Sequence, residues 1–155
     1  MSRWQNYDHL KNTFPFPNEV FFLGLCSGEL AVYAFLLCSA NRKTQKCWPS
    51  YKTIGKAVGM SENTVAKYVS RLESKGFIRT EPTTVITKTE MKRNGNLMYT
   101  ILPIQGAVEI YHARRLAAMN AERAHQETIR RIEDYNRKHP DNPVLVTDNQ
   151  SALAL

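Results

Sequence analysis

The chain of 155 residues has few cysteines and no long apolar run, and each absence excludes a class of protein. Cys26, Cys38 and Cys47 are an odd number without CxxC spacing, which argues against a disulfide framework and against a zinc finger. The most apolar run, residues 30–40, is far shorter than the roughly 20 residues of a membrane-spanning helix, and the polar start has no signal-peptide core. We therefore expect a cytoplasmic protein with no membrane partner.

Signatures of catalysis and of bound cofactors are missing as well. The four histidines have neither HxH nor HExxH spacing, and no glycine-rich loop of the GxxxxGK[ST] type is present. A nicking enzyme of DNA replication would need clustered histidines for a metal together with a nucleophilic tyrosine, and the histidine clusters are absent. The sequence thus predicts no enzyme, no metal site and no cofactor, and it gives no indication of a small-molecule ligand.

Positive charge is abundant and is concentrated in one quarter of the chain. The net charge is +7 with a pI near 9.5, which admits nucleic acid or an acidic membrane as a partner. Residues 41–80 alone contain nine Lys and Arg against two acids, a balance of +7, so the other segments sum to zero.

A first helix is predicted from a cap at Ser27 through Cys38, with Glu29 in its first turn. This helix is apolar on nearly all sides, so it needs cover on more than one face. The candidates for covering its second face are the aromatic arm, the C-terminal helix and another subunit. The aromatic residues of the arm are Phe14, Phe16, Phe21 and Phe22.

Two further helices follow the basic loop NRKTQKCWP. Ser50 caps the short helix YKTIGKAV, and Gly59 then supplies the left-handed residue that a tight turn between two helices requires. We predict the recognition helix of a helix-turn-helix from Ser61, its cap, to Lys75. Its buried stripe is Val65, Val69 and Leu72.

The remaining elements are a hairpin and a long helix. Strands FIRTEPTTVITKTEM and LMYTILP flank Asn94-Gly95, a strong signal for a hairpin turn, which places Lys92 and Arg93 near the tip. One long helix, rich in Ala, Arg and Glu, then begins near Ile104 and ends before Pro140.

These elements define an α+β, mainly helical fold: a winged helix-turn-helix of three helices and a two-stranded β-hairpin wing, with a long C-terminal helix. We divide the chain into an N-terminal arm (1–17), the winged domain (18–103), the long helix, a possible dimerisation element (104–139), and a flexible tail (140–155).

Opposite the buried stripe, the recognition helix presents Asn63, Thr64, Lys67 and Arg71, flanked by Glu62 and Tyr68. Asn pairs with adenine, Arg or Lys with guanine, and the Thr methyl meets that of thymine, so double-stranded DNA is the expected partner. Tyr68 could instead pack on the domain edge, and Glu62 could serve only the helix dipole. The expected phosphate contacts are Ser50, Ser61, Lys43, Lys46, Lys52, Lys92 and Arg93. The last two could instead only keep a ribbon edge soluble.

The segments WPS, TIGKAVGMSENTV and LESKGFI carry a resemblance to a known family. From Phe14 to Pro103, the chain resembles winged helix-turn-helix proteins related to the N-terminal domain of replication initiator proteins of plasmids and conjugative elements. The resemblance implies DNA binding by the residues named above. It leaves two roles open, transcriptional regulation in bacteria, including on a mobile element, and replication initiation.

The state of assembly is also open. Residues seven apart along the C-terminal helix, such as Ala118, His125 and Ile132, make a poor coiled-coil seam, so this helix either folds back on the winged domain or pairs with another subunit. We expect a homodimer, because helix-turn-helix proteins commonly read two symmetric half-sites. The contrasting hypothesis is a protein-interaction scaffold that docks through the long helix.

Overall fold

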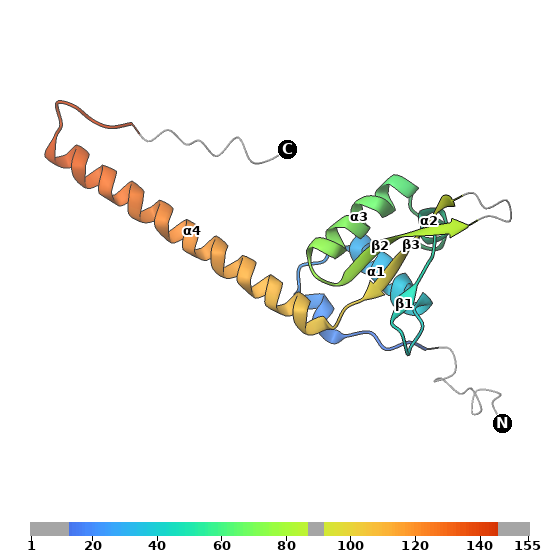
Figure 1. Ribbon diagram of the computed structural model, residues 1–155. Helices are drawn as coiled ribbons and strands as arrows, with labels where there is room; N and C mark the ends of the chain where they lie inside the picture. The colour runs from blue at the N-terminus through green and yellow to red at the C-terminus, as the bar shows by residue number, and fades with distance from the viewer. Residues whose placement is uncertain (1–12, 87–91, 146–155) are drawn as a thin grey trace, which may run out of the picture. The chain divides into compact units, whose positions relative to one another are not determined.

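A computed structural model describes residues 13–86 and 92–145 (Figure 1). The elements in chain order are η1 (Asn18–Phe22), α1 (Ser27–Ser39), β1 (Lys46–Cys47), α2 (Tyr51–Val58), α3 (Glu62–Ser74), β2 (Ile78–Ile86), β3 (Lys92–Ile101) and α4 (Ile104–Lys138). The α+β winged helix-turn-helix with a long C-terminal helix is thereby confirmed. Among the described helices, none is long and apolar enough to cross a membrane.

The chain forms two compact units, one ending at Tyr111 and the other beginning at His112. The boundary falls inside α4, so the first two turns of that helix belong to the first unit. Ala107 of α4 is 1% exposed there, and a side chain at Gly76 would collide with Ile110. The start of α4 is therefore packed against the turn between α3 and β2.

Helix α1 begins at Ser27, one residue earlier than predicted. The cap is Cys26 and not Ser27, because the Glu29 carboxylate, three residues on, accepts the backbone N–H of Cys26 at 2.9 Å. Part of the aromatic arm covers this helix, since the Phe16 ring lies 6.0 Å from that of Tyr33. Phe21 and the neighbouring Phe22 stay on the surface.

Three antiparallel strands in the order β1-β3-β2 form the sheet. Strand β1 was missed in the sequence because it has only two residues, which pair with Thr100 and Tyr99 of β3. Its pairing partner lies more than fifty positions away along the chain, so no local pattern reveals it.

The predicted hairpin turn at Asn94-Gly95 was wrong. Both residues lie within β3, and Asn94 pairs with Thr84 while Leu97 pairs with Pro82, so two residues of β3 face one of β2. The Asn-Gly pair thus sits at a β-bulge. The β-branched run of β2 continues the ladder past it to Ile86, which pairs with Lys92, and residues 87–91 between them lie outside the described part of the chain.

The hydrophobic core of the first unit lies between the three helices and the sheet. Tyr33 and Phe77 meet edge to face at 5.1 Å in this core. Its other members include Val32, Leu36, Ile54, Val65, Val69, Leu72, Ile78, Tyr99 and Ile101. This core fixes which face of α3 is turned outward.

In the second unit, two hydrogen bonds join the segment after α4 to that helix. The side-chain amide of Asn136 donates to the backbone oxygen of Val144 at 2.9 Å and accepts its N–H at 2.8 Å. Val144 is thus joined to α4, whereas residues 146–155 lie outside the described part of the chain. That residues 140–155 form a flexible tail stays a prediction.

Candidate nucleic-acid interface

The corner between α2 and α3 is built as the sequence predicts. Ser50 Oγ accepts the N–H of Thr53 at 3.1 Å, and Ser61 Oγ accepts that of Thr64 at 3.2 Å, so serine side chains cap both helices. Gly59 has a φ of 71°, the left-handed conformation expected of it. A side chain at Gly55 would collide with the backbone oxygen of Met60, the residue after Gly59. A glycine is therefore also needed within α2.

Helix α3 displays the predicted division into faces. Val65, Val69 and Leu72 are each at most 2% exposed, which confirms the buried stripe. On the outer side Asn63, Lys67 and Arg71 are exposed, whereas Thr64 is half-buried and its hydroxyl lies 2.9 Å from Ser61 Oγ. Thr64 is therefore partly engaged in the cap. Ser70, which the sequence reasoning omitted, is also exposed on this helix.

Tyr68 packs within the domain. Its ring lies so close to Gly28 of α1 that a side chain at Gly28 would collide with it, and the ring is half-buried against the core. The packing on the domain edge that the sequence allowed for Tyr68 is therefore present, and a contact of Tyr68 with DNA stays a prediction.

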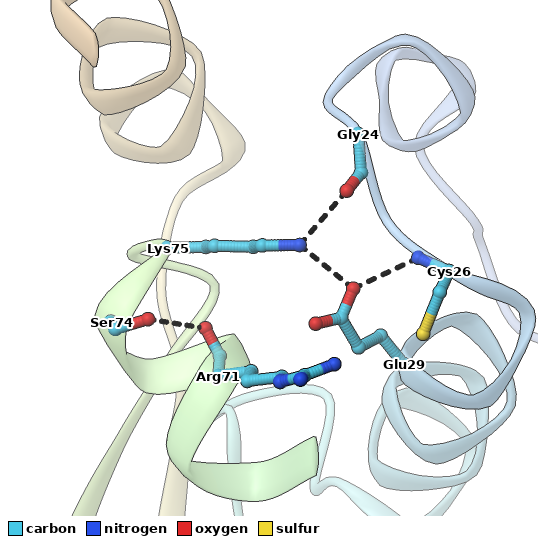
Figure 2. Close-up of polar contacts among 6 residues, drawn as sticks. All are labelled: Gly24, Cys26, Glu29, Arg71, Ser74 and Lys75. Carbon is cyan, nitrogen blue, oxygen red and sulfur yellow. Dashed lines mark hydrogen bonds and ion pairs between the residues drawn. The ribbon is translucent and has the colours of Figure 1, made fainter. Parts of the chain in front are cut away.

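The carboxyl end of α3 is held by a buried ion pair that joins it to the start of α1 (Figure 2). Lys75 Nζ donates to Glu29 Oε2 and to the backbone oxygen of Gly24, both at 2.8 Å. Glu29 is 1% exposed, and its Oε2 also accepts the N–H of Cys26. Burial acts to raise the pKa of Glu29, but the hydrogen bonds from Lys75 and Cys26 outweigh it and lower that pKa overall.

The amino ends of α2 and α3 approach the wing. A hollow of about 210 Å³ is lined by Ser50 and Tyr51 of α2, by Glu62 of α3 and by residues 95–97 of β3. Glu62 therefore faces the base of the wing. Burial, together with the charge of Glu73, raises the pKa of Tyr51 above its ordinary value.

The basic residues predicted to contact phosphates lie at separate places on the domain. Lys52 lies beside the helix-turn-helix corner with Lys56, which the sequence reasoning missed although it stands four residues further along α2. Lys46 is in β1, at the Ile101 end of β3. Lys43 is exposed in the loop before β1, and its neighbour Arg42 donates to the Thr13 backbone oxygen at 2.6 Å.

The two wing candidates, Lys92 and Arg93, open β3 and pair with Ile86 and Val85 of β2. They thus stand at the end of β3 that borders residues 87–91, and not beside a turn at Asn94-Gly95. Their side chains lie outside the described residues.

Trp48 is a further surface feature that the sequence reasoning did not single out. Its side chain is 50% exposed, and its backbone oxygen accepts from the Asn96 side chain at 3.2 Å. In the sequence, Trp48 stands in the basic loop NRKTQKCWP. This position could have marked it as a candidate for DNA contact, because bases stack on aromatic side chains.

The geometry defines a winged helix-turn-helix domain with a capped, outward-facing third helix. A family model described as a helix-turn-helix domain matches residues 23–78, which span α1, α2 and α3. The LexA repressor of Staphylococcus carnosus (strain TM300) is 42% identical over 66 residues, which are 39% of this chain and 32% of that protein. The chain thus matches about a third of the length of this curated relative.

Two solved structures give low similarity scores to this chain. A possible transcriptional regulator from Methanosarcina mazei Go1 gives a TM-score of 0.45 at 17% identity, over 77% of this chain and 97% of that one. A MarR-family transcriptional regulator from Silicibacter pomeroyi gives 0.35 at 16% identity, over 83% and 80%. Scores this low do not establish a common fold over the full lengths, so the helix-turn-helix assignment rests on the match to residues 23–78.

Proposed function

We propose that the chain is a sequence-specific double-stranded DNA-binding protein that regulates transcription, with α3 in the major groove and the wing on the backbone. The observation that carries this proposal is the exposed face of α3, where Asn63, Lys67 and Arg71 stand opposite a fully buried stripe. Their groups match base edges in the major groove. The name of the curated relative, a repressor, supports the regulatory role.

The phosphate contacts would come from around this face. Ser50 and Ser61 cap helices whose amino ends suit phosphate oxygens, and Lys52 and Lys56 lie beside the corner. Lys46 and the wing pair Lys92 and Arg93 add sequence-independent attraction. Lys43, in the same loop as Arg42, is the candidate with the least support from the geometry.

A titration of labelled genomic fragments, followed by fluorescence anisotropy at several salt concentrations, tests the proposal. Five phosphate contacts predict a slope of log K against log salt of roughly −4.5. Replacing Lys67 and Arg71 together by Ala should weaken specific binding at least about 30-fold, since each lost base contact costs about 1–3 kcal/mol.

The matched control removes the same charge elsewhere. Arg123 and Arg130 are exposed on α4, and the double Ala variant there should bind within about threefold of the parent chain if only the α3 face reads bases. Equal losses in both variants, or no salt-dependent binding by the parent chain, would refute the proposed role of α3.

Replication initiation is the alternative, supported by the resemblance of residues 14–103. The DNA chemistry is the same and the target differs. Footprinting on the DNA that encodes the protein separates the two roles. Protected sites that overlap promoters favour regulation, and protected iterated repeats at an origin favour initiation.

We further propose a homodimer. From His112 to Lys138, α4 has no buried residue, and it exposes Leu116 (59%) and Met119 (48%). Light scattering coupled to size exclusion measures the mass directly. A monomer at micromolar concentration would contradict the homodimer and favour the alternative, in which α4 folds back on its own winged domain.

A further inference from the structure

A hollow of about 370 Å³ lies away from the α3 face, between the arm and the end of α1. Its apolar wall is formed by Phe14, Pro15, Leu37 and Ala40, and the Cys38 thiol borders it. Arg42 and Gln45 supply the polar groups. Small-molecule sites have this size and composition, an apolar lining with a few polar groups that orient the ligand.

The polar side of the hollow is held in place by the loop before β1. Arg42 donates to the Thr13 backbone oxygen at 2.6 Å with Nη2, which fixes the guanidinium at the edge of the hollow. A guanidinium carries five N–H donors, so one that binds a carbonyl through a single nitrogen can still bind a carboxylate. The side chain of Gln45 donates to the Arg42 backbone oxygen at 2.8 Å and steadies the same turn.

Gln45 also has an unusual backbone. Its φ of 56° is left-handed, which is uncommon for a residue other than glycine, and such strain gathers at ligand-binding and other functional sites. Its N–H donates to the Asn41 oxygen at 2.7 Å, and its own oxygen accepts from Ile101 of β3 at 2.8 Å. The strained residue therefore links the hollow to the sheet.

We propose that this hollow binds a small organic carboxylate with an apolar body, the carboxylate on Arg42 and the body between Phe14 and Leu37. The site does not depend on DNA binding. It lies on the arm, the end of α1 and the loop before β1, none of which contributes to the α3 face.

The cysteines of the chain provide the measurement. Cys38 borders the hollow and is exposed, Cys26 is exposed at the other end of α1, and Cys47 is buried. Alkylation by iodoacetamide, followed by peptide mass spectrometry, reports the three thiols separately in the full chain. Hexanoate is the probe and hexanamide, its uncharged counterpart, is the comparison.

We expect hexanoate to slow alkylation of Cys38 and not of Cys26. A ligand of this size binds with a roughly millimolar dissociation constant. At about ten times that concentration the Cys38 rate should fall about tenfold, and it should saturate. Equal slowing of Cys26, no slowing of Cys38, or equal protection by hexanamide would overturn the proposal.

Three variants locate the site. Arg42→Ala should abolish the protection, and Lys43→Ala, which removes the same charge one residue away, should leave it within about twofold. Since Arg42 also binds the arm, Ala40→Leu provides an independent test: it fills the hollow, keeps Arg42, and should reduce the protection. Protection that survives both Arg42→Ala and Ala40→Leu, or that Lys43→Ala also abolishes, contradicts the proposed site.

Discussion

The pair of Lys75 and Glu29 predicts an asymmetry between two single substitutions. Lys75→Met leaves the Glu29 carboxylate, whose side chain is 2% exposed, with its charge unpaired. Such a loss costs about 2–4 kcal/mol of unfolding free energy. Glu29→Gln leaves Lys75, 25% exposed, with the Gly24 oxygen and water as partners, and should cost only about 1–2 kcal/mol.

Urea unfolding followed by circular dichroism and tryptophan fluorescence measures these differences, provided that both probes give one transition. The double variant removes both charges at once. It should therefore be more stable than the sum of the single losses predicts, by about 1 kcal/mol or more.

An exposed ion pair of the same chain serves as the control. Arg137 and Asp134 lie 3.4 Å apart with side chains 78% and 52% exposed, so Arg137→Ala should change stability by no more than about 0.5 kcal/mol. A Lys75→Met loss as small as that of the control, or strictly additive effects of the two core substitutions, would show that the pair does not hold the end of α3.

Further perturbations have expected outcomes in the same unfolding assay. Gly55→Ala should cost about 1–3 kcal/mol because the new methyl meets the Met60 oxygen, while Gly106→Ala, with no atom within 4 Å, should stabilise by about 0.5–1 kcal/mol; the same sign for both would refute the packing argument. Ser61→Ala removes the cap of α3 and should cost about 1 kcal/mol; no loss would mean that the cap is redundant. The pKa of Glu29 in the folded chain lies below its ordinary value of 4.5. As the pH falls from about 5, the Glu29 carboxylate is therefore protonated in the unfolded chain first, and the free energy of unfolding decreases. Glu29→Gln should flatten that acid slope, and an unchanged slope would contradict the shift.

The parts of the fold that follow local rules could be predicted from the sequence. Helix α3 repeats its apolar residues with helical spacing between a serine cap and a glycine, and both signals act within a few residues. Its buried and exposed faces follow from that spacing alone. The same holds for α2 and for the left-handed Gly59.

The parts that depend on distant partners could not be predicted from the sequence. The Asn94-Gly95 signal was read as a turn, yet pairing between β2 and β3 outweighed it and made it a bulge. Glu29 and Lys75 are 46 residues apart, so no pattern connects them. Tyr68 has the position of an outward residue, and only the nearby Gly28 of α1 explains why it packs within the domain.

Under the proposed function these distant contacts matter, because they fix the end of a helix whose other end is capped by Ser61. A side chain held in place before binding loses less conformational freedom on binding, which favours specific contacts. If the proposed function is correct, Glu29→Gln should therefore loosen the Lys75 end of α3 and weaken specific binding about threefold or more. The same change removes a negative charge, so binding to random-sequence DNA should stay equal or strengthen. A parallel change in both affinities would mean that the ion pair contributes only charge. Weaker specific binding with equal or stronger binding to random-sequence DNA would support a role of the pair in positioning α3.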